Sequence, residues 1–166
     1  ACVSCAMLWG YANPYSFSGP IVPPEMFQGR DKVIHEIEDS LGSAVLYGGR
    51  QLGKSACLRQ FARKYHEPEL NHYVVYRDIK QVGKPGADSS PSAVWKYIAQ
   101  GLYEVGFPIS ARATADDIVR AVKTQMGAKP ELRIWVLLDE ADDFLRVDAT
   151  SRKQAPFTVV QQLKDL

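Results

Sequence analysis

Hydrophobic residues follow two different spacings along this chain. Helical spacing recurs in residues 31–41, 54–65, 92–105, 114–126 and 157–166. Thr114 and Asp117 have the spacing of a capping box at the start of the fourth of these helices. Runs rich in β-branched and aromatic residues, typical of strands, occur at residues 43–48, 72–79 and 132–139. The last of these runs is apolar on both alternating faces from Ile134 onward, which is typical of a central parallel strand covered by helices. The order of the elements predicts an α/β fold with a mainly parallel sheet.

The N-terminal part of the chain departs from both spacings. Residues 11–30 contain the helix-breaking residues Pro14, Gly19, Pro20, Pro23, Pro24 and Gly29. We therefore expect an extended lead-in over residues 1–30 and a folded domain over residues 31–166.

Composition excludes several classes of protein. The 166 residues carry 20 Lys and Arg against 19 Asp and Glu, a net charge of +1, so no strongly basic nucleic-acid-binding character is indicated. No apolar run reaches the length of about 18 residues that a membrane span needs, so no membrane partner is expected. Cys57 lies on the apolar face of the predicted helix 54–65, and the Cys2 and Cys5 pair has no second pair to complete a zinc site. This sparse cysteine content favours a reduced, cytoplasmic location.

Residues 48–55 read GGRQLGKS, which fits the phosphate-loop pattern G-x-x-x-x-G-K-[ST]. In such a loop, glycines let successive backbone N–H groups surround phosphate oxygens at the start of a helix. We expect Lys54 to bridge the β- and γ-phosphates and the Ser55 hydroxyl to ligate Mg²⁺. The alternative is an ordinary glycine-rich turn with a solvated lysine. The residues expected to contact nucleotide here are Gly48, Gly49, Arg50, Gln51, Leu52, Gly53, Lys54, Ser55 and Ala56.

A pair of acidic residues ends the most hydrophobic run of the chain. Asp139 closes that run and Glu140 follows it. A carboxylate at the C-terminal end of a buried parallel strand faces the crevice where α/β folds bind ligands. We expect Asp139 to hold Mg²⁺ through its water shell, and Glu140 to be catalytic, together with Lys54, by polarising the attacking water. A strand followed by an exposed turn is the alternative; Asp142 and Asp143 are interpreted as solvated or helix-capping.

Together, the segments NPYSFSGPIVPPEMFQGR, GGRQLGKSACLRQF and VLLDEADDFL resemble the STAND branch of the AAA+-like P-loop ATPases. The resemblance implies a three-layer P-loop sandwich, ATP or ADP with Mg²⁺ as cofactors, and a slow, regulated ATPase. It further implies a signalling switch, in some cases of antiviral defence, that acts with other domains of its chain and as a homo-oligomer. In this family the lead-in packs near the adenine, which assigns Phe27, Gly29 and Arg30 to nucleotide binding.

Two other functions stay open at this point. One is a DNA-acting AAA+ ATPase of the initiator or transposition-helper type, and the other is a module that holds nucleotide without turnover. The Asp-Glu pair resembles the glutamate-using branch, in which a further strand lies between the strand before the phosphate loop and the strand ending at Asp139. We expect that strand, and the family's sensor, lid and winged helix, beyond Leu166, so that the domain is incomplete at its C-terminus. Arg59 and Arg63 are placed on a solvated helix face, and the histidines His35, His66 and His72 are interpreted as structural or surface residues.

Overall fold

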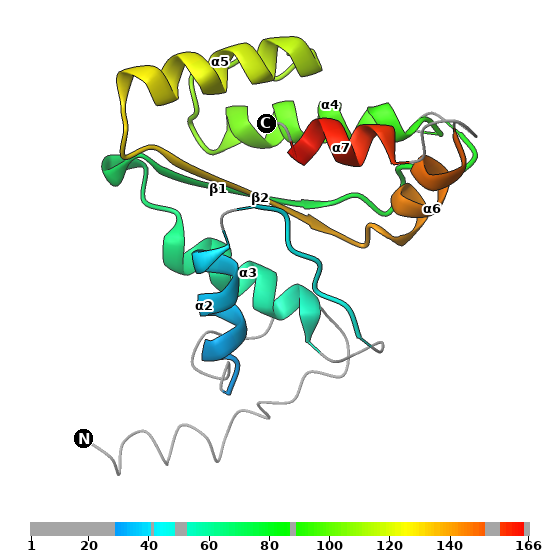
Figure 1. The fold of residues 1–166 in the computed structure, drawn as a ribbon, viewed down its shortest axis with the longest axis horizontal. Coiled ribbons are helices and arrows are strands. Elements are labelled where there is room, and N and C mark those ends of the chain that lie inside the picture. The colour runs from blue at the N-terminus through cyan, green and yellow to red at the C-terminus, as the bar shows by residue number, and fades with distance from the viewer. Residues whose placement is uncertain (1–28, 41, 49–52, 87–88, 152–156, 165–166) are drawn as a thin grey trace, which may run out of the picture.

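A computed structural model of the chain describes residues 29–40, 42–48, 53–86, 89–151 and 157–164. These residues form a mixed α/β fold with a two-stranded parallel sheet (Figure 1). The strands are β1 (His72–Asp78) and β2 (Arg133–Asp139). The helices are α2 (Asp31–Asp39), α3 (Lys54–Tyr65), α4 (Val94–Glu104), α5 (Ala115–Ala128), α6 (Asp142–Ser151) and α7 (Thr158–Lys164), with 3-10 turns η2 (Pro68–Leu70) and η3 (Pro91–Ala93).

Local sequence signals account for where these helices begin. The Thr114 hydroxyl accepts the N–H of Asp117, whose carboxylate accepts the N–H of Thr114, so the predicted capping box opens α5. The turn η3, with Pro91 at its start, precedes α4, which therefore begins at Val94 rather than at the predicted residue 92. α3 has the predicted bounds at both ends.

The two strands pair in parallel and end at the same level. His72 lies opposite Arg133, and Asp78 lies opposite Asp139. The chain passes through α4 and α5 between the strands, since parallel strands need a long crossover connection. The Ile79 N–H donates to the Asp139 carbonyl at 3.0 Å, which extends the pairing to the predicted end of the first strand.

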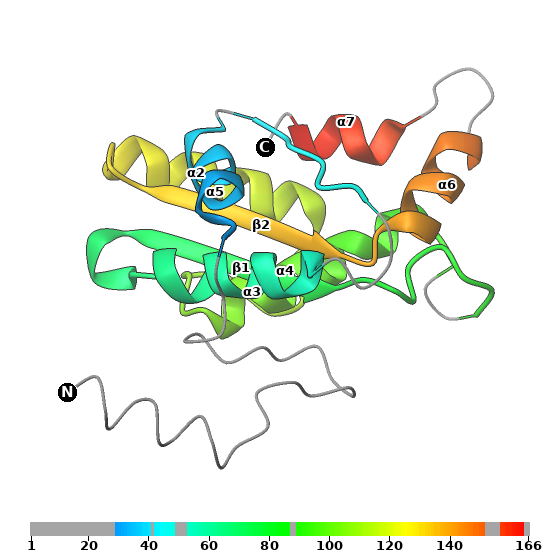
Figure 2. The same ribbon diagram turned by 90° about the horizontal axis from the view of Figure 1, so that it is seen from below.

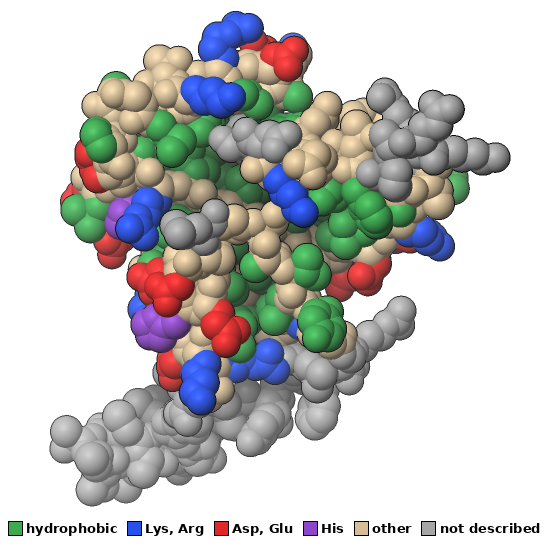
Figure 3. All heavy atoms as spheres, viewed as in Figure 1, with side chains coloured by type: hydrophobic (Ala, Val, Ile, Leu, Met, Phe, Trp, Pro, Cys, Tyr) green, Lys and Arg blue, Asp and Glu red, His purple; other side chains and the backbone are tan. Residues whose placement is uncertain are grey.

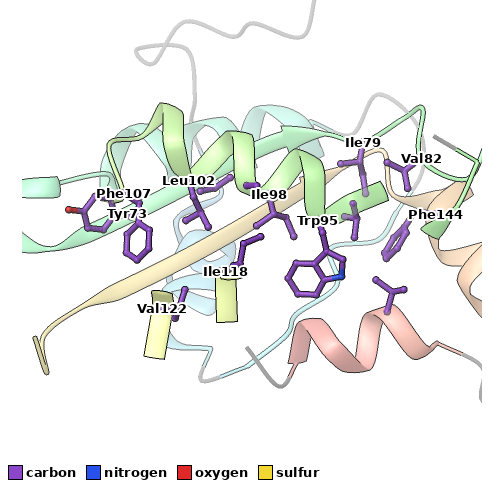
Figure 4. Close-up of a cluster of buried hydrophobic side chains, with 14 of the residues drawn as sticks. Tyr73, Ile79, Val82, Trp95, Ile98, Leu102, Phe107, Ile118, Val122 and Phe144 are labelled. Carbon is purple, nitrogen blue, oxygen red and sulfur yellow. The ribbon is translucent and has the colours of Figure 1, made fainter. Parts of the chain in front are cut away.

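Helices cover both faces of this sheet, because successive strand side chains point to opposite sides. α4, α5 and α7 lie over one face, and α2 and α3 lie over the other (Figure 1). The larger core fills the α4 side, and at Gly101 the helix approaches β1 so closely that a Cβ atom would lie 2.3 Å from Cγ1 of Val75. The core side chains labelled in Figure 4 are Tyr73, Ile79, Val82, Trp95, Ile98, Leu102, Phe107, Ile118, Val122 and Phe144.

A smaller core packs α3 against the opposite face of the sheet. Val74 of β1 and Leu137 of β2 pack there against a cluster that includes Cys57 and Phe61, both fully buried. The Phe61 ring also meets the Trp135 ring edge-on, with centroids 5.7 Å apart. Cys57 is thus the core residue that its position in the helix predicted. The packing of this cluster also sets where along the sheet α3 begins.

The predicted strand at residues 43–48 is wrong for the structure described. Residues 42–48 form neither strand nor helix, and Val45 and Tyr47 are 73% and 89% exposed. The segment runs beside β2 on the side away from β1 (Figure 2). A strand exists only when its backbone groups bond to a neighbouring strand, and among the described residues β2 pairs with β1 alone.

The three-layer P-loop sandwich stays a prediction, because the sheet of the described residues has two strands. The lead-in over residues 1–30 stays a prediction too, since residues 1–28 lie outside the described part. The terminal helix expected at residues 157–166 is present as α7. Within the described ranges, no helix combines the length and apolar character that crossing a membrane requires.

Candidate functional site

The start of α3 lies where the glycine-rich motif predicts a phosphate loop. Lys54 and Ser55 occupy the first turn, and Gly53 precedes them with a φ of 71°. That left-handed conformation favours glycine, which explains the second glycine of the motif. The first-turn residue Ala56 is half-buried. The predicted contacts at Gly49, Arg50, Gln51 and Leu52 lie outside the described residues.

Lys54 links the two ends of this loop. Its Nζ donates a hydrogen bond to the carbonyl oxygen of Gly48 at 2.9 Å. The ammonium group thus reaches back from the first turn of α3 to the first glycine of the motif.

The end of the lead-in meets the same loop. The guanidinium of Arg30 comes within 3.8 Å of the position that a Cβ on Gly53 would occupy. Arg30 also opposes the rise that burial causes in the pKa of the Cys57 thiol, one turn into α3. Gly29, with a φ of 81°, turns the chain into this position. Arg30 and Gly53, predicted from separate motifs, are thus neighbours, while Phe27 lies outside the described residues.

Asp139 and Glu140 occupy different environments at the end of β2. The Asp139 side chain faces α3, on the same face as Leu137, and the residue is 8% exposed. Its Oδ1 accepts the backbone N–H of Glu140 at 3.0 Å. Glu140 is exposed and has a φ of 54°, a region that residues other than glycine rarely adopt. Such conformations cost of order 1–3 kcal/mol and gather at functional sites.

Two further residues belong to this site, and the sequence analysis missed them. The Tyr76 hydroxyl donates to Oδ2 of Asp139 at 2.7 Å. In turn, Nε of Arg59 donates to the Tyr76 hydroxyl at 3.1 Å. The placement of Arg59 on a solvated face was therefore wrong, because its guanidinium lies against Tyr76, whereas Arg63 is exposed as predicted. The sequence does contain one indication of the role of Tyr76. It lies two positions before the end of a strand that neighbours the strand ending at Asp139.

All these groups lie at one edge of the sheet. The start of α3 and the C-terminal end of β2 lie on the same side of the molecule in two perpendicular views (Figures 1 and 2). The site therefore offers a cation, backbone N–H groups at a helix start, a hydroxyl and two carboxylates. The oxygen donors Ser55 and Asp139 are of the type that Mg²⁺ prefers. Among the residues described, no group of three or more His, Cys, Asp or Glu side chains forms a metal site of the all-protein kind.

Other candidate residues have structural roles. His66 accepts the backbone N–H of Val74 through Nδ1 at 3.2 Å, and His35 lies 3.1 Å from the carboxylate of Glu38. Asp143 pairs with Lys84 at 3.6 Å and with Arg146. A shallow hollow of about 760 Å³ lies elsewhere, along α4 and residues 111–115, and contains none of the predicted site residues.

Compared with known proteins, the chain matches no family profile, no curated protein and no solved structure. A functional assignment therefore rests on the motifs and on the geometry of this edge.

Proposed function

We propose that this chain binds Mg²⁺-ATP between the start of α3, with Lys54 and Ser55, and the end of β2, with Asp139, and hydrolyses it slowly as a switch module. The observation that carries the proposal is a juxtaposition. A phosphate-loop motif opens α3, and the acidic pair that ends β2 lies at the same edge and is linked to α3 through Tyr76. These two motifs are 85 residues apart from Lys54 to Asp139, so the fold and not the chain order brings them to the same side of the molecule.

Each residue has a definite task in this proposal. Lys54 would exchange its bond to the Gly48 carbonyl for bonds to the β- and γ-phosphates. Ser55 and Asp139 would hold Mg²⁺, which when bound neutralises charge on the phosphate oxygens. Glu140, exposed beside the buried Asp139, would accept a proton from the attacking water.

The position of Arg30 beside Gly53 supports a STAND-like arrangement, in which a lead-in segment packs on the nucleotide loop. In that arrangement ATP and ADP alter how the domain packs on other domains of its chain, and oligomerisation and signalling, including defence, follow. In the space-filling view, acidic and basic side chains are interspersed over the visible face without a basic patch (Figure 3). This face offers DNA no basic patch, and together with the net charge of +1 this favours a nucleotide-controlled switch over the DNA-acting alternative.

Titration with a fluorescent ATP analogue in the presence of Mg²⁺ tests the binding step. Lys54→Ala is expected to weaken binding about 10- to 100-fold, because a hydrogen bond to a charged group is lost. Lys123→Ala is the matched control, since Lys123 is an exposed lysine of α5 on the other face of the sheet. Equal affinities for the two variants would exclude a phosphate site at this loop.

Phosphate release by the intact protein separates the three functions. A switch ATPase releases phosphate slowly without DNA, whereas a DNA-acting ATPase is stimulated when duplex or single-stranded DNA is added. Tight binding without any release, with or without DNA, would assign the chain to the modules that hold nucleotide without turnover.

A further inference from the structure

The carboxylate of Asp139 is held through both of its oxygens. Oδ2 accepts the Tyr76 hydroxyl at 2.7 Å, and Oδ1 accepts the backbone N–H of Glu140 at 3.0 Å. Two bonds from different directions fix the plane of a carboxylate and hence the direction of its remaining lone pairs. Because Asp139 is only 8% exposed, solvent contributes little to this orientation.

The parallel register of β1 and β2 places the Tyr76 hydroxyl within hydrogen-bonding distance of Asp139. Tyr76 lies opposite Leu137 in the parallel pair, so Asp139 is its diagonal neighbour two positions further along β2. Both side chains belong to the sheet face that α3 covers, because Tyr76 packs with Leu137 in the smaller core. A tyrosine at the neighbouring positions of β1 would point to the α4 side instead.

Arg59 extends the contact to α3. Its Nε donates to the Tyr76 oxygen at 3.1 Å, and its guanidinium carbon lies 4.9 Å from the centre of the Tyr76 ring. An arginine only donates hydrogen bonds and an ionised aspartate only accepts them, so the bonds run from Arg59 through Tyr76 to Asp139. A tyrosine hydroxyl is protonated at neutral pH, so it can donate to the Asp139 carboxylate. Arg59 lies one helical turn after Ser55.

We infer that Tyr76 is a positioning residue for Asp139, and that Arg59 acts through Tyr76 to tie the phosphate-loop helix to the metal-binding end of β2. The inference rests on the proposed function, since it concerns how the same site holds Mg²⁺. Groups that orient a metal-binding carboxylate contribute 10- to 100-fold to metal affinity or activity in other proteins.

The test is a Mg²⁺ titration of nucleotide binding, followed with a fluorescent ATP analogue. Tyr76→Phe keeps the ring that the Arg59 guanidinium lies against. It removes the hydroxyl, and with it the hydrogen bonds to Asp139 and from Arg59. Its Mg²⁺ midpoint is expected to rise about 10-fold or more, while its affinity for the nucleotide in EDTA equals that of the parent. Tyr73→Phe is the matched control, because Tyr73 lies on the same strand but faces the α4 side.

A second pair of variants examines the link to α3. Arg59→Met is expected to raise the Mg²⁺ midpoint by a smaller factor, and Arg63→Met, on the exposed side of the same helix, leaves it unchanged. The double variant Arg59→Met with Tyr76→Phe is expected to behave like Tyr76→Phe alone, because residues in one hydrogen-bonded chain are not additive.

The outcomes distinguish the inference from the function on which it rests. If the parent binds Mg²⁺-nucleotide and Tyr76→Phe has the parent's Mg²⁺ midpoint, the positioning role is overturned even if the variant melts at a lower temperature. If the parent binds no nucleotide at all, the proposed function fails and the inference fails with it.

Discussion

The backbone N–H of Glu140 donates a hydrogen bond to Oδ1 of Asp139 at 3.0 Å, while Glu140 adopts a φ of 54°. The backbone turns at Glu140, so the carboxylates of Asp139 and Glu140 enter different environments. Asp139 stays beneath α3 and is 8% exposed, whereas Glu140 is exposed. Neighbouring acidic residues in different environments are suited to different tasks, which fits the proposed division between metal binding by Asp139 and proton transfer by Glu140.

Substitutions of the two carboxylates are therefore expected to have different effects. Glu140→Gln retains Mg²⁺-ATP and slows hydrolysis about 100-fold or more, since an amide is a poor proton acceptor. Asp139→Asn raises the Mg²⁺ concentration needed for nucleotide binding, because a charged metal-binding group is lost. Binding titrations and phosphate release, carried out on the same preparations of the intact protein, measure both effects.

Glu69→Gln serves as the control for Glu140→Gln, because Glu69 is an exposed glutamate of η2. Equal hydrolysis rates for the parent and Glu140→Gln would remove the catalytic role from Glu140. Loss of nucleotide binding in Glu140→Gln would indicate instead that this residue contributes to the binding site itself.

The close approach of α4 to β1 predicts a sensitive position at Gly101. Gly101→Ala places a methyl group 2.3 Å from Cγ1 of the fully buried Val75, so that the core side chains or the helix must shift. Overpacking of this kind lowers the free energy of unfolding by about 1–3 kcal/mol, which urea denaturation measures.

The same substitution at Gly127 is the matched control. Gly127 lies in α5 and nothing surrounds the position of its missing Cβ within 4 Å. Because alanine is favoured over glycine in a helix, Gly127→Ala is expected to raise the free energy of unfolding by about 0.5–1 kcal/mol. Equal effects at the two positions would contradict the close packing at Gly101.

Two half-buried tyrosines predict a loss of stability at alkaline pH. Burial, followed by hydrogen bonds to Glu38 and to Asp139, raises the pKa of Tyr65 and of Tyr76 to about 12 in each case. An unfolded tyrosine has a pKa of about 10, so between about pH 10 and pH 12 the unfolded chain loses protons that the folded chain keeps. The stabilisation is thus fully present below about pH 10 and is lost as the pH rises through about 12.

Urea titrations across this range in Tyr65→Phe and Tyr76→Phe measure the effect. Each variant is expected to show a shallower fall in the free energy of unfolding than the parent, since lysines and other tyrosines titrate alike in all of them. Tyr103→Phe, which removes a hydroxyl from a residue that is 58% exposed, is expected to retain the parent's slope. A parental slope in all three variants would mean that these hydrogen bonds do not survive in solution.

Local patterns in the sequence predicted most of the elements and the two motifs on which the proposed site rests. Helical periodicity together with the phosphate-loop motif placed α3 at 54–65, and the pair Thr114 and Asp117 located the start of α5. Runs of β-branched residues identified both strands to within one residue at each end. These features depend on residues close together in the chain, so sequence alone determines them, as it did the positions of Lys54 and Asp139 at the ends of their elements.

The pairing of distant segments was decided only in three dimensions. The run at 43–48 has the composition of a strand, but among the described residues it has no hydrogen-bonded neighbour and stays exposed. Tyr76 and Asp139, 63 positions apart, meet because the parallel register sets Tyr76 opposite Leu137, and one residue of slip would have turned Tyr76 to the other face. The helical periodicity of residues 54–65 showed which side of α3 is apolar. Only the packing of that helix on the sheet brought Arg59 to Tyr76. The strand register and the position of the helix both arise from packing between segments that no local pattern connects.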